Sequence, residues 1–184
     1  SKDGITNDEL LNLSSEVYLS GGKDGLMGMV LHPKLGIGAG EINYVYIAYT
    51  YSTAGKTGWT YPSPGTDPVK LAANAADDAT RRTKIVRYEY NVTANNGALT
   101  NPTTIIEGLS SSNDHNSGKL TIGPDTKLYY TIGDLGVNQF ANKCNVNRSQ
   151  EIPTLAMLNS VPPNYEYYQG KTLRLNLDGS IPDD

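Results

Sequence analysis

The 184-residue chain has a net charge of −4 and no run of Lys or Arg, which argues against nucleic acid as its main partner because phosphate neutralisation needs a basic face. No apolar stretch reaches the length of a membrane span, and the single cysteine, Cys144, excludes an internal disulfide or a cysteine-based metal site. With 19 Gly, 10 Pro and 13 Tyr, the composition is typical of a turn-rich globular β protein.

Short segments of β-type composition follow one another along the chain. Residues 16–19, Glu-Val-Tyr-Leu, predict the last strand of a preceding unit. The next segments are rich in Val, Ile and Tyr, and the first of them stops before Pro33, because proline cannot continue a hydrogen-bonded ladder. We predict four strands here, over residues 26–32, 43–52, 83–91 and 103–107.

The same order of segments returns about ninety residues later. The matching pairs are 29–34 with 120–125, 44–49 with 128–132, and 84–91 with 171–178. A repeat of four-stranded antiparallel units predicts an all-β fold that is part of a β-propeller. A β-sandwich is the alternative, but it does not require the order of strands to repeat.

The repeat divides the chain into about one blade, residues 20–108, and most of the next, residues 109–184. Two long excursions, 52–82 and 135–169, interrupt these units, and loops of such length are either functional or variable surface. One whole blade flanked by parts of two others leaves strand edges and apolar faces uncovered. We therefore expect further chain on both sides.

Four segments resemble the glucose/sorbosone dehydrogenase family, which includes the soluble glucose dehydrogenases that use pyrroloquinoline quinone (PQQ). They are residues 25–33, 111–120, 123–134 and 170–182, in the family's order. The resemblance implies part of a six-bladed propeller in an enzyme that oxidises the C1 hydroxyl of aldose sugars to the lactone, with hydride transfer to PQQ. It also implies Ca²⁺ as a cofactor, a periplasmic or secreted location, and the rest of the propeller chain as a partner, and it leaves a homodimer open.

The resemblance also assigns roles to individual residues. His115 matches the base that removes the hydroxyl proton, and Asp134 matches the carboxylate that orients it. Asp114 and Gln139 match residues that line the sugar and cofactor pocket, and Lys23 stands where the family has a Gln or Arg type of residue. From the residues alone, a histidine among Ser and Asn is most often an exposed loop residue, and an aspartate after a glycine is an ordinary turn residue.

Two other functions stay open. A non-catalytic propeller that serves as a binding module is compatible with Lys23 and with the long aromatic loops, and a purely structural β domain is the third option. Retention of both His115 and Asp134 favours the enzyme. In the family, the Ca²⁺ ligands and the arginines that clamp PQQ lie beyond residue 184, so we assign no metal ligand here and expect the chain alone to be inactive. His32, which precedes Pro33 at a strand end, is interpreted as structural.

Overall fold

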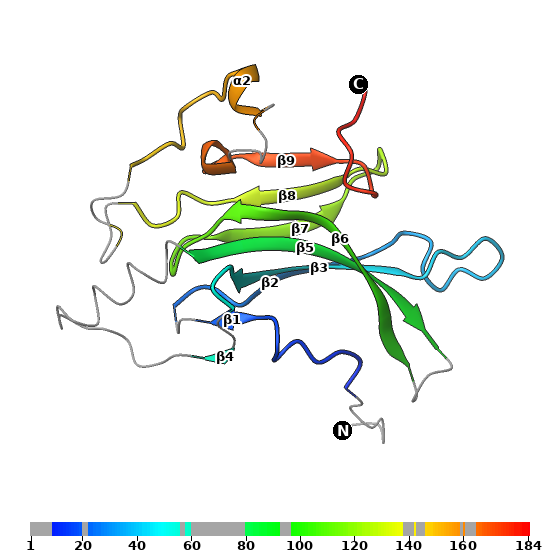
Figure 1. The fold of residues 1–184 in the computed structure, drawn as a ribbon. Helices are drawn as coiled ribbons and strands as arrows, with labels where there is room; N and C mark the ends of the chain where they lie inside the picture. Colours follow the sequence, from blue (N-terminus) through cyan, green and yellow to red (C-terminus); the bar gives the residue numbers. More distant parts are fainter. Residues whose placement is uncertain are drawn as a thin grey trace.

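The computed structural model is almost entirely β (Figure 1). It describes residues 9–19, 22–55, 58–59, 80–92, 97–137, 142, 146–158, 160 and 165–184. The strands are β1 (Tyr18–Leu19), β2 (Leu26–Leu31), β3 (Tyr44–Ser52), β4 (Gly58–Trp59), β5 (Arg81–Asn91), β6 (Ala98–Ser110), β7 (Ser117–Ile122), β8 (Leu128–Ile132) and β9 (Thr172–Leu175). A single helical turn, α2 (Leu155–Leu158), and a 3-10 turn, η2 (Tyr165–Tyr168), lie in the second excursion.

The first repeat forms one antiparallel sheet of order β2-β3-β5-β6, which confirms the four-stranded prediction. Its outer strand β6 begins at Ala98 instead of 103. The predicted segment began only after Pro102, whereas β6 runs through this proline, which is tolerated because β6 is an edge strand. A register shift in the β5–β6 pairing and a positive φ of 50° at Asn101 accommodate the proline.

The second repeat forms a three-stranded antiparallel sheet of order β7-β8-β9, as predicted from the matching segments. The two sheets meet where β2 lies beside β7. There the backbones approach closely: a side chain on Gly28 would overlap the carbonyl oxygen of Gly118, and one on Gly118 would overlap Met27. Only glycine fits at these two points of contact.

The main core fills the space between the two sheets. Tyr46 and Ile85 of the first sheet are fully buried in the same cluster as Leu128 and Tyr130 of the second. The Tyr46 hydroxyl donates to the carbonyl of Leu177, and burial raises its pKa to about 12, so it remains a neutral donor. This shared core is what a repeat structure requires, since neither sheet can bury its apolar face alone.

The opposite face of the first sheet is covered by the segment that precedes β2, on the side away from β8 and β9 (Figure 1). Leu11, Leu13 and Val17 pack there against a second buried cluster that includes Tyr49 and Val86. The expected strand over 16–19 is reduced to the two residues of β1, which pair in parallel with β4. Its assignment to a preceding blade therefore stays a prediction, as do the blade boundaries.

Candidate active site

Three connections meet at one end of the two sheets. They are the segment that enters β2, the loop from β6 to β7, and the turn that leaves β8. The first two are tied together by main-chain contacts: Lys23 N–H donates to the Asn113 carbonyl at 2.7 Å, and the Asn116 side chain donates to the Lys23 carbonyl at 2.9 Å. Four of the five predicted site residues lie here, whereas Gln139 lies outside the described residues.

His115 and Asp134 form a direct pair across this end of the second sheet. His115 Nδ1 lies 2.9 Å from Asp134 Oδ1, and the two side chains are 33% and 44% exposed. Gly133 makes the approach possible, because a side chain there would overlap the His115 carbonyl oxygen. The Gly136 N–H donates to the same Asp134 oxygen at 3.1 Å. The pair is thus held in place and still accessible to a ligand.

The loop that carries His115 is organised by buried polar side chains. Asn116 is only 4% exposed, and its amide accepts from Ser111 and from the Ser112 N–H while donating to the Ser112 carbonyl. The Ser112 hydroxyl lies 2.6 Å from the Asp114 carbonyl oxygen and 2.9 Å from that of Leu135, so both carbonyls share its one proton. Sequence reasoning did not identify Asn116 or Ser112, because Ser and Asn before a strand also occur in solvent-exposed turns.

The backbone at His115 has a conformation that is unusual for a non-glycine residue. His115 has φ of 49° and Ser117 has φ of 65°, in the left-handed region that disfavours non-glycine residues. The Asp114 carboxylate stabilises this turn by accepting the His115 N–H at 2.8 Å. Backbone strain held in place by such hydrogen bonds is a common feature of functional sites.

Lys23 and Asp114 form a second pair beside the first. Lys23 Nζ lies 3.0 Å from Asp114 Oδ1, with the lysine side chain 70% exposed and the aspartate 13%. The same carboxylate oxygen is 3.8 Å from His115 Nε2. Lys23, Asp114, His115 and Asp134 therefore form one continuous polar cluster.

This arrangement favours general-base chemistry. Neutral imidazole with its proton on Nδ1 donates that proton to Asp134, which leaves the Nε2 lone pair available for a ligand. Within the described residues, no group of three or more His, Cys, Asp or Glu side chains is placed to hold a metal ion. The cluster contains one positive charge, on Lys23, against two carboxylates.

His32 differs from His115 in each of these respects. It is buried, its Nδ1 accepts the Lys34 N–H at 3.1 Å, and its ring packs edge-on against Tyr44. Burial, with a smaller effect of the Lys34 charge, lowers the pKa of His32, so it stays neutral. These contacts agree with the structural role expected from the sequence.

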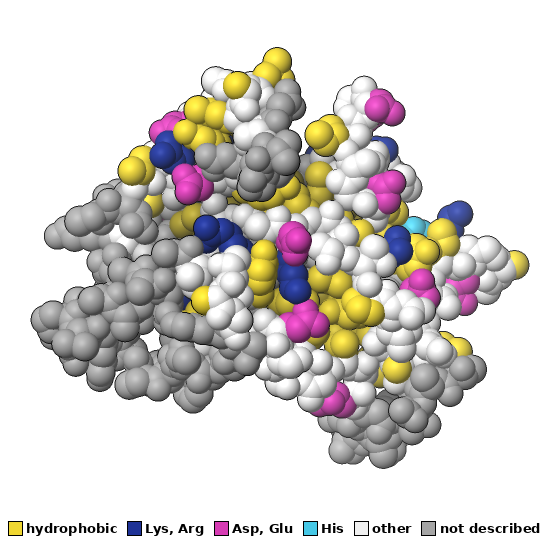
Figure 2. All heavy atoms as spheres, viewed as in Figure 1, with side chains coloured by type: hydrophobic (Ala, Val, Ile, Leu, Met, Phe, Trp, Pro, Cys, Tyr) yellow, Lys and Arg dark blue, Asp and Glu magenta, His cyan; other side chains and the backbone are white. Residues whose placement is uncertain are grey.

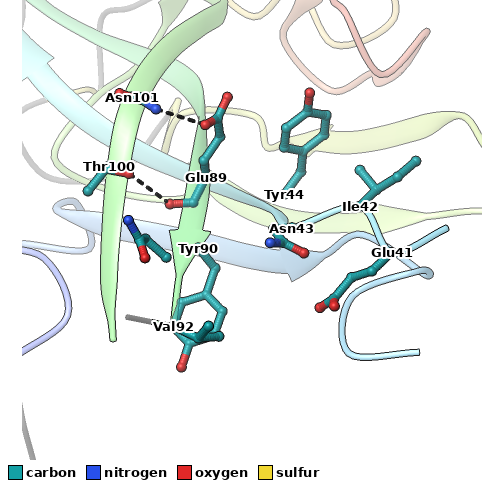
Figure 3. Close-up of a pocket in the computed structure, with 10 residues that line it drawn as sticks. Glu41, Ile42, Asn43, Tyr44, Glu89, Tyr90, Val92, Thr100 and Asn101 are labelled. Atoms are coloured by element: carbon teal, nitrogen blue, oxygen red, sulfur yellow. Dashed lines mark hydrogen bonds between the residues drawn. The ribbon is translucent and has the colours of Figure 1, made fainter. Parts of the chain in front are cut away.

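A separate hollow of about 500 Å³ lies at the other end of the first sheet (Figure 3). It is lined by ends of β3, β5 and β6, including Tyr44, Glu89 and Thr100, and contains none of the predicted site residues. The surface drawn in Figure 2 shows Lys and Arg interspersed with Asp and Glu, without a continuous basic patch. No helix in the described part of the chain is long and apolar enough to cross a membrane.

The fold and this cluster define the class of protein: sheets repeated as in a β-propeller, with an accessible His–Asp pair at one end. The family model for Glucose / Sorbosone dehydrogenase matches residues 1–184. The chain is 40% identical over 163 residues to quinoprotein glucose dehydrogenase B of Acinetobacter calcoaceticus, a match that covers 89% of this chain and 29% of that protein. The chain therefore belongs to the glucose/sorbosone dehydrogenase family, and it spans less than a third of that relative's length.

Solved structures agree with the fold. The PQQ-bound aldose sugar dehydrogenase of Streptomyces coelicolor superposes with a TM-score of 0.54 at 22% identity, over 92% of this chain and 35% of that one. An oxidoreductase (glucose dehydrogenase) of Thermus thermophilus gives 0.52 at 22%, over 91% and 34%. This likeness confirms the prediction of an all-β chain that is part of a propeller.

Proposed function

We propose that the chain is part of an oxidoreductase that oxidises the C1 hydroxyl of an aldose sugar to the lactone, with PQQ as the hydride acceptor. The family membership and the quinoprotein relative support this proposal. The observation that carries it is the 2.9 Å pairing of His115 Nδ1 with Asp134, which leaves the other ring nitrogen, Nε2, of an accessible histidine with only a 3.8 Å approach to Asp114.

His115 is the proposed base. A hydride leaves a sugar carbon readily only if the hydroxyl proton is removed in concert, and neutral imidazole is suited to this near pH 7. Nε2 takes the proton from the C1 hydroxyl, and the resulting imidazolium is stabilised by the Asp134 carboxylate on Nδ1. Asp134 thereby fixes both the tautomer and the ring orientation.

The described residues fit PQQ only in part. The ammonium of Lys23 suits a carboxylate or carbonyl oxygen of the quinone, but Asp114 and Asp134 oppose the binding of an anion. PQQ supplies hydride-accepting chemistry when bound. We assign Lys23, Asp114 and Gln139 to its pocket or that of the sugar, and we propose that most of the positive charge, including Ca²⁺, is supplied by chain outside these 184 residues.

The remaining assignments follow from the same proposal. Residues 20–108 would form about one blade and 109–184 most of the next, in a longer six-bladed chain that is periplasmic or secreted. The rest of that chain is then a required partner, and a homodimer is compatible with it. The 184 residues alone would neither bind PQQ tightly nor oxidise sugar.

The test is replacement of His115 in the full-length protein loaded with PQQ and Ca²⁺. His115→Gln should lower kcat for dye-linked aldose oxidation by about 10²- to 10⁴-fold, the usual contribution of a general base. The matched control is His32→Gln, which removes the buried histidine and should affect stability more than kcat. Near-normal turnover in His115→Gln would place the base elsewhere, and absence of any sugar oxidation by the loaded wild type would favour the binding-module alternative.

A further inference from the structure

The chain returns from its second excursion through a short segment that contacts the back of the active-site turn. η2 ends at Tyr168, and Gln169 and Gly170 follow it before β9. Gln169 is 4% exposed, and both ends of its amide are used. Nε2 donates to the Asp134 carbonyl at 2.7 Å, and Oε1 accepts the Arg148 N–H at 2.5 Å.

Two consecutive residues of this segment bind two consecutive residues of the turn. The Gln169 side chain binds the carbonyl of Asp134, and the Gly170 N–H donates to the carbonyl of Gly133 at 2.9 Å. Within the described residues, the Asp134 carbonyl also accepts a 3.4 Å bond from the Val137 N–H. The residues on either side of Asp134 are bound to the loop of His115: the Gly133 N–H donates to the Asn116 carbonyl at 3.0 Å, and the Leu135 N–H donates to the His115 carbonyl at 3.3 Å. Gln169, a residue remote in sequence, therefore makes the shorter of the two bonds to the Asp134 carbonyl and holds the turn on the side away from the His115 loop.

Gln169 is in turn fixed by the aromatic segment before it. The Tyr165 carbonyl accepts from the Ser110 hydroxyl at the end of β6, and the Tyr165 ring lies against Gly108. After Gln169, the Lys171 ammonium donates to the carbonyls of Arg148, Ser149 and Gln169, at 3.2, 2.8 and 2.9 Å. The aromatic run and Lys171 give the buried amide a defined position.

We propose that Gln169 is a positioning residue, which holds the Asp134 carboxylate against His115 Nδ1 and so maintains the tautomer with a free Nε2. This inference rests on the proposed function. A polar group that directly orients a functional histidine typically contributes about 10- to 100-fold in activity. Gln169 lies one contact farther back, behind Asp134, so we expect an effect at the lower end of that range. The competing role is purely structural: Gln169 would only attach residues 146–151 to the sheet.

Two methionine variants of the full-length protein separate these roles. Gln169→Met keeps the length of the side chain but removes the bonds to both Asp134 and Arg148. Lys171→Met removes the bonds from the ammonium to the carbonyls of Arg148, Ser149 and Gln169, and it leaves the bond from the Gln169 side chain to Asp134 in place. Both variants should lower the melting temperature, but only Gln169→Met should change the tautomer of His115.

The first readout does not need the cofactor. With ¹⁵N-labelled histidine in the apoprotein, at a pH where imidazole is neutral, the wild type and Lys171→Met should show His115 protonated on Nδ1. Gln169→Met should show a mixture of the two tautomers. With PQQ and sugar, Gln169→Met should lower kcat by about tenfold with little change in KM, in the range of such second contacts.

A single Nδ1-protonated tautomer and wild-type kcat in Gln169→Met would overturn the inference, as would equal loss of kcat in Lys171→Met. His115→Gln is measured beside them. If His115→Gln abolishes turnover while Gln169→Met does not, only the positioning role fails. If His115→Gln retains turnover, the proposed function itself fails, and the tautomer measurement still decides the structural claim.

Discussion

The two repeats place an ionisable side chain at the same point and treat it in opposite ways. In the first repeat, Asp24 stands directly before Gly25, and the Gly25 carbonyl accepts a hydrogen bond from the Thr50 N–H. In the second repeat, His115 stands directly before Asn116, and the Asn116 carbonyl accepts the corresponding hydrogen bond from the Gly133 N–H. Asp24 forms a 3.0 Å ion pair with Arg81, with both side chains fully buried. His115 forms its pair with Asp134 at a similar distance, but with a third or more of each side chain exposed.

This difference in exposure gives the two pairs different roles, one in stability and one in chemistry. A buried pair such as Asp24–Arg81, which also lies against the Tyr18 ring, cannot exchange a proton with a ligand. Breaking it leaves an uncompensated charge in the interior. The exposed pair contributes little to stability, but its free nitrogen can reach a substrate. We therefore expect changes in the Asp24–Arg81 pair to affect folding and changes in the His115–Asp134 pair to affect turnover.

The largest of these effects concerns the buried pair. Arg81→Met should lower the free energy of unfolding by about 3–5 kcal/mol, because it removes the positive charge that lies 3.0 Å from the buried Asp24 carboxylate. Urea unfolding of the full-length protein measures this. The double variant Asp24→Leu with Arg81→Met should recover most of the loss, since an apolar replacement of both partners is often neutral. A double variant as unstable as the single one would mean that packing against Tyr18, not charge, dominates.

The second effect concerns the exposed pair. Asp134→Asn should lower kcat by about 10- to 100-fold, because the amide can donate to Nδ1 and select the wrong tautomer of His115. Its unfolding free energy should change by no more than about 1 kcal/mol, as for other exposed pairs. Steady-state kinetics and urea unfolding on the same sample check both values. A variant that lost stability but kept kcat would reverse the contrast with Arg81.

The smallest effect concerns a third, partly exposed ion pair, which joins Glu16, before β1, to Lys84 of β5. Lys84 and the Tyr49 hydroxyl both bind Glu16 Oε2, at 2.8 and 2.6 Å, and hold the pKa of the Glu16 carboxyl below its ordinary value. A lowered folded-state pKa stabilises the fold above the unfolded-state pKa, and this contribution is lost as pH falls through the folded-state value. Glu16→Gln should therefore cost about 1 kcal/mol or less at pH 7 and nothing in strong acid. Urea unfolding of the wild type and of Glu16→Gln at pH 7 and in strong acid measures this loss. An equal loss of unfolding free energy under both conditions would rule out the charge interaction.

The strands were predictable because they depend on local composition and on a repeat visible within the chain. β4 was not predicted, since a two-residue strand leaves almost no pattern. β6 was predicted too short, since its first five residues include Asn101 and Pro102, which are uncommon in strands away from a sheet edge. Local sequence therefore located the sheets better than it located their ends.

The site was predictable only where a motif marks it. His115 and Asp134 were assigned through family resemblance, and their proximity is a feature of the structure. Gln169 and the Asp24–Arg81 pair carried no signal, because each contact joins residues 35 or more positions apart. An isolated Gln, Asp or Arg in a loop looks solvated until the partner strand is placed beside it.

The close contact at Gly28 and Gly118 also sets the shape of the assembly. At the seam of β2 and β7, Gly28 lies directly against the Gly118 backbone and Gly118 against Met27, whereas farther out Tyr46, Ile85 and Tyr130 fill the gap between the sheets. The space between successive sheets is thus a wedge, thin at its inner edge and thick outside. If this wedge is repeated from one sheet to the next, each sheet is rotated relative to the one before it about a common axis. The curvature of a propeller then follows from small residues at the inner edge, Gly28 and Gly118, and large side chains farther out.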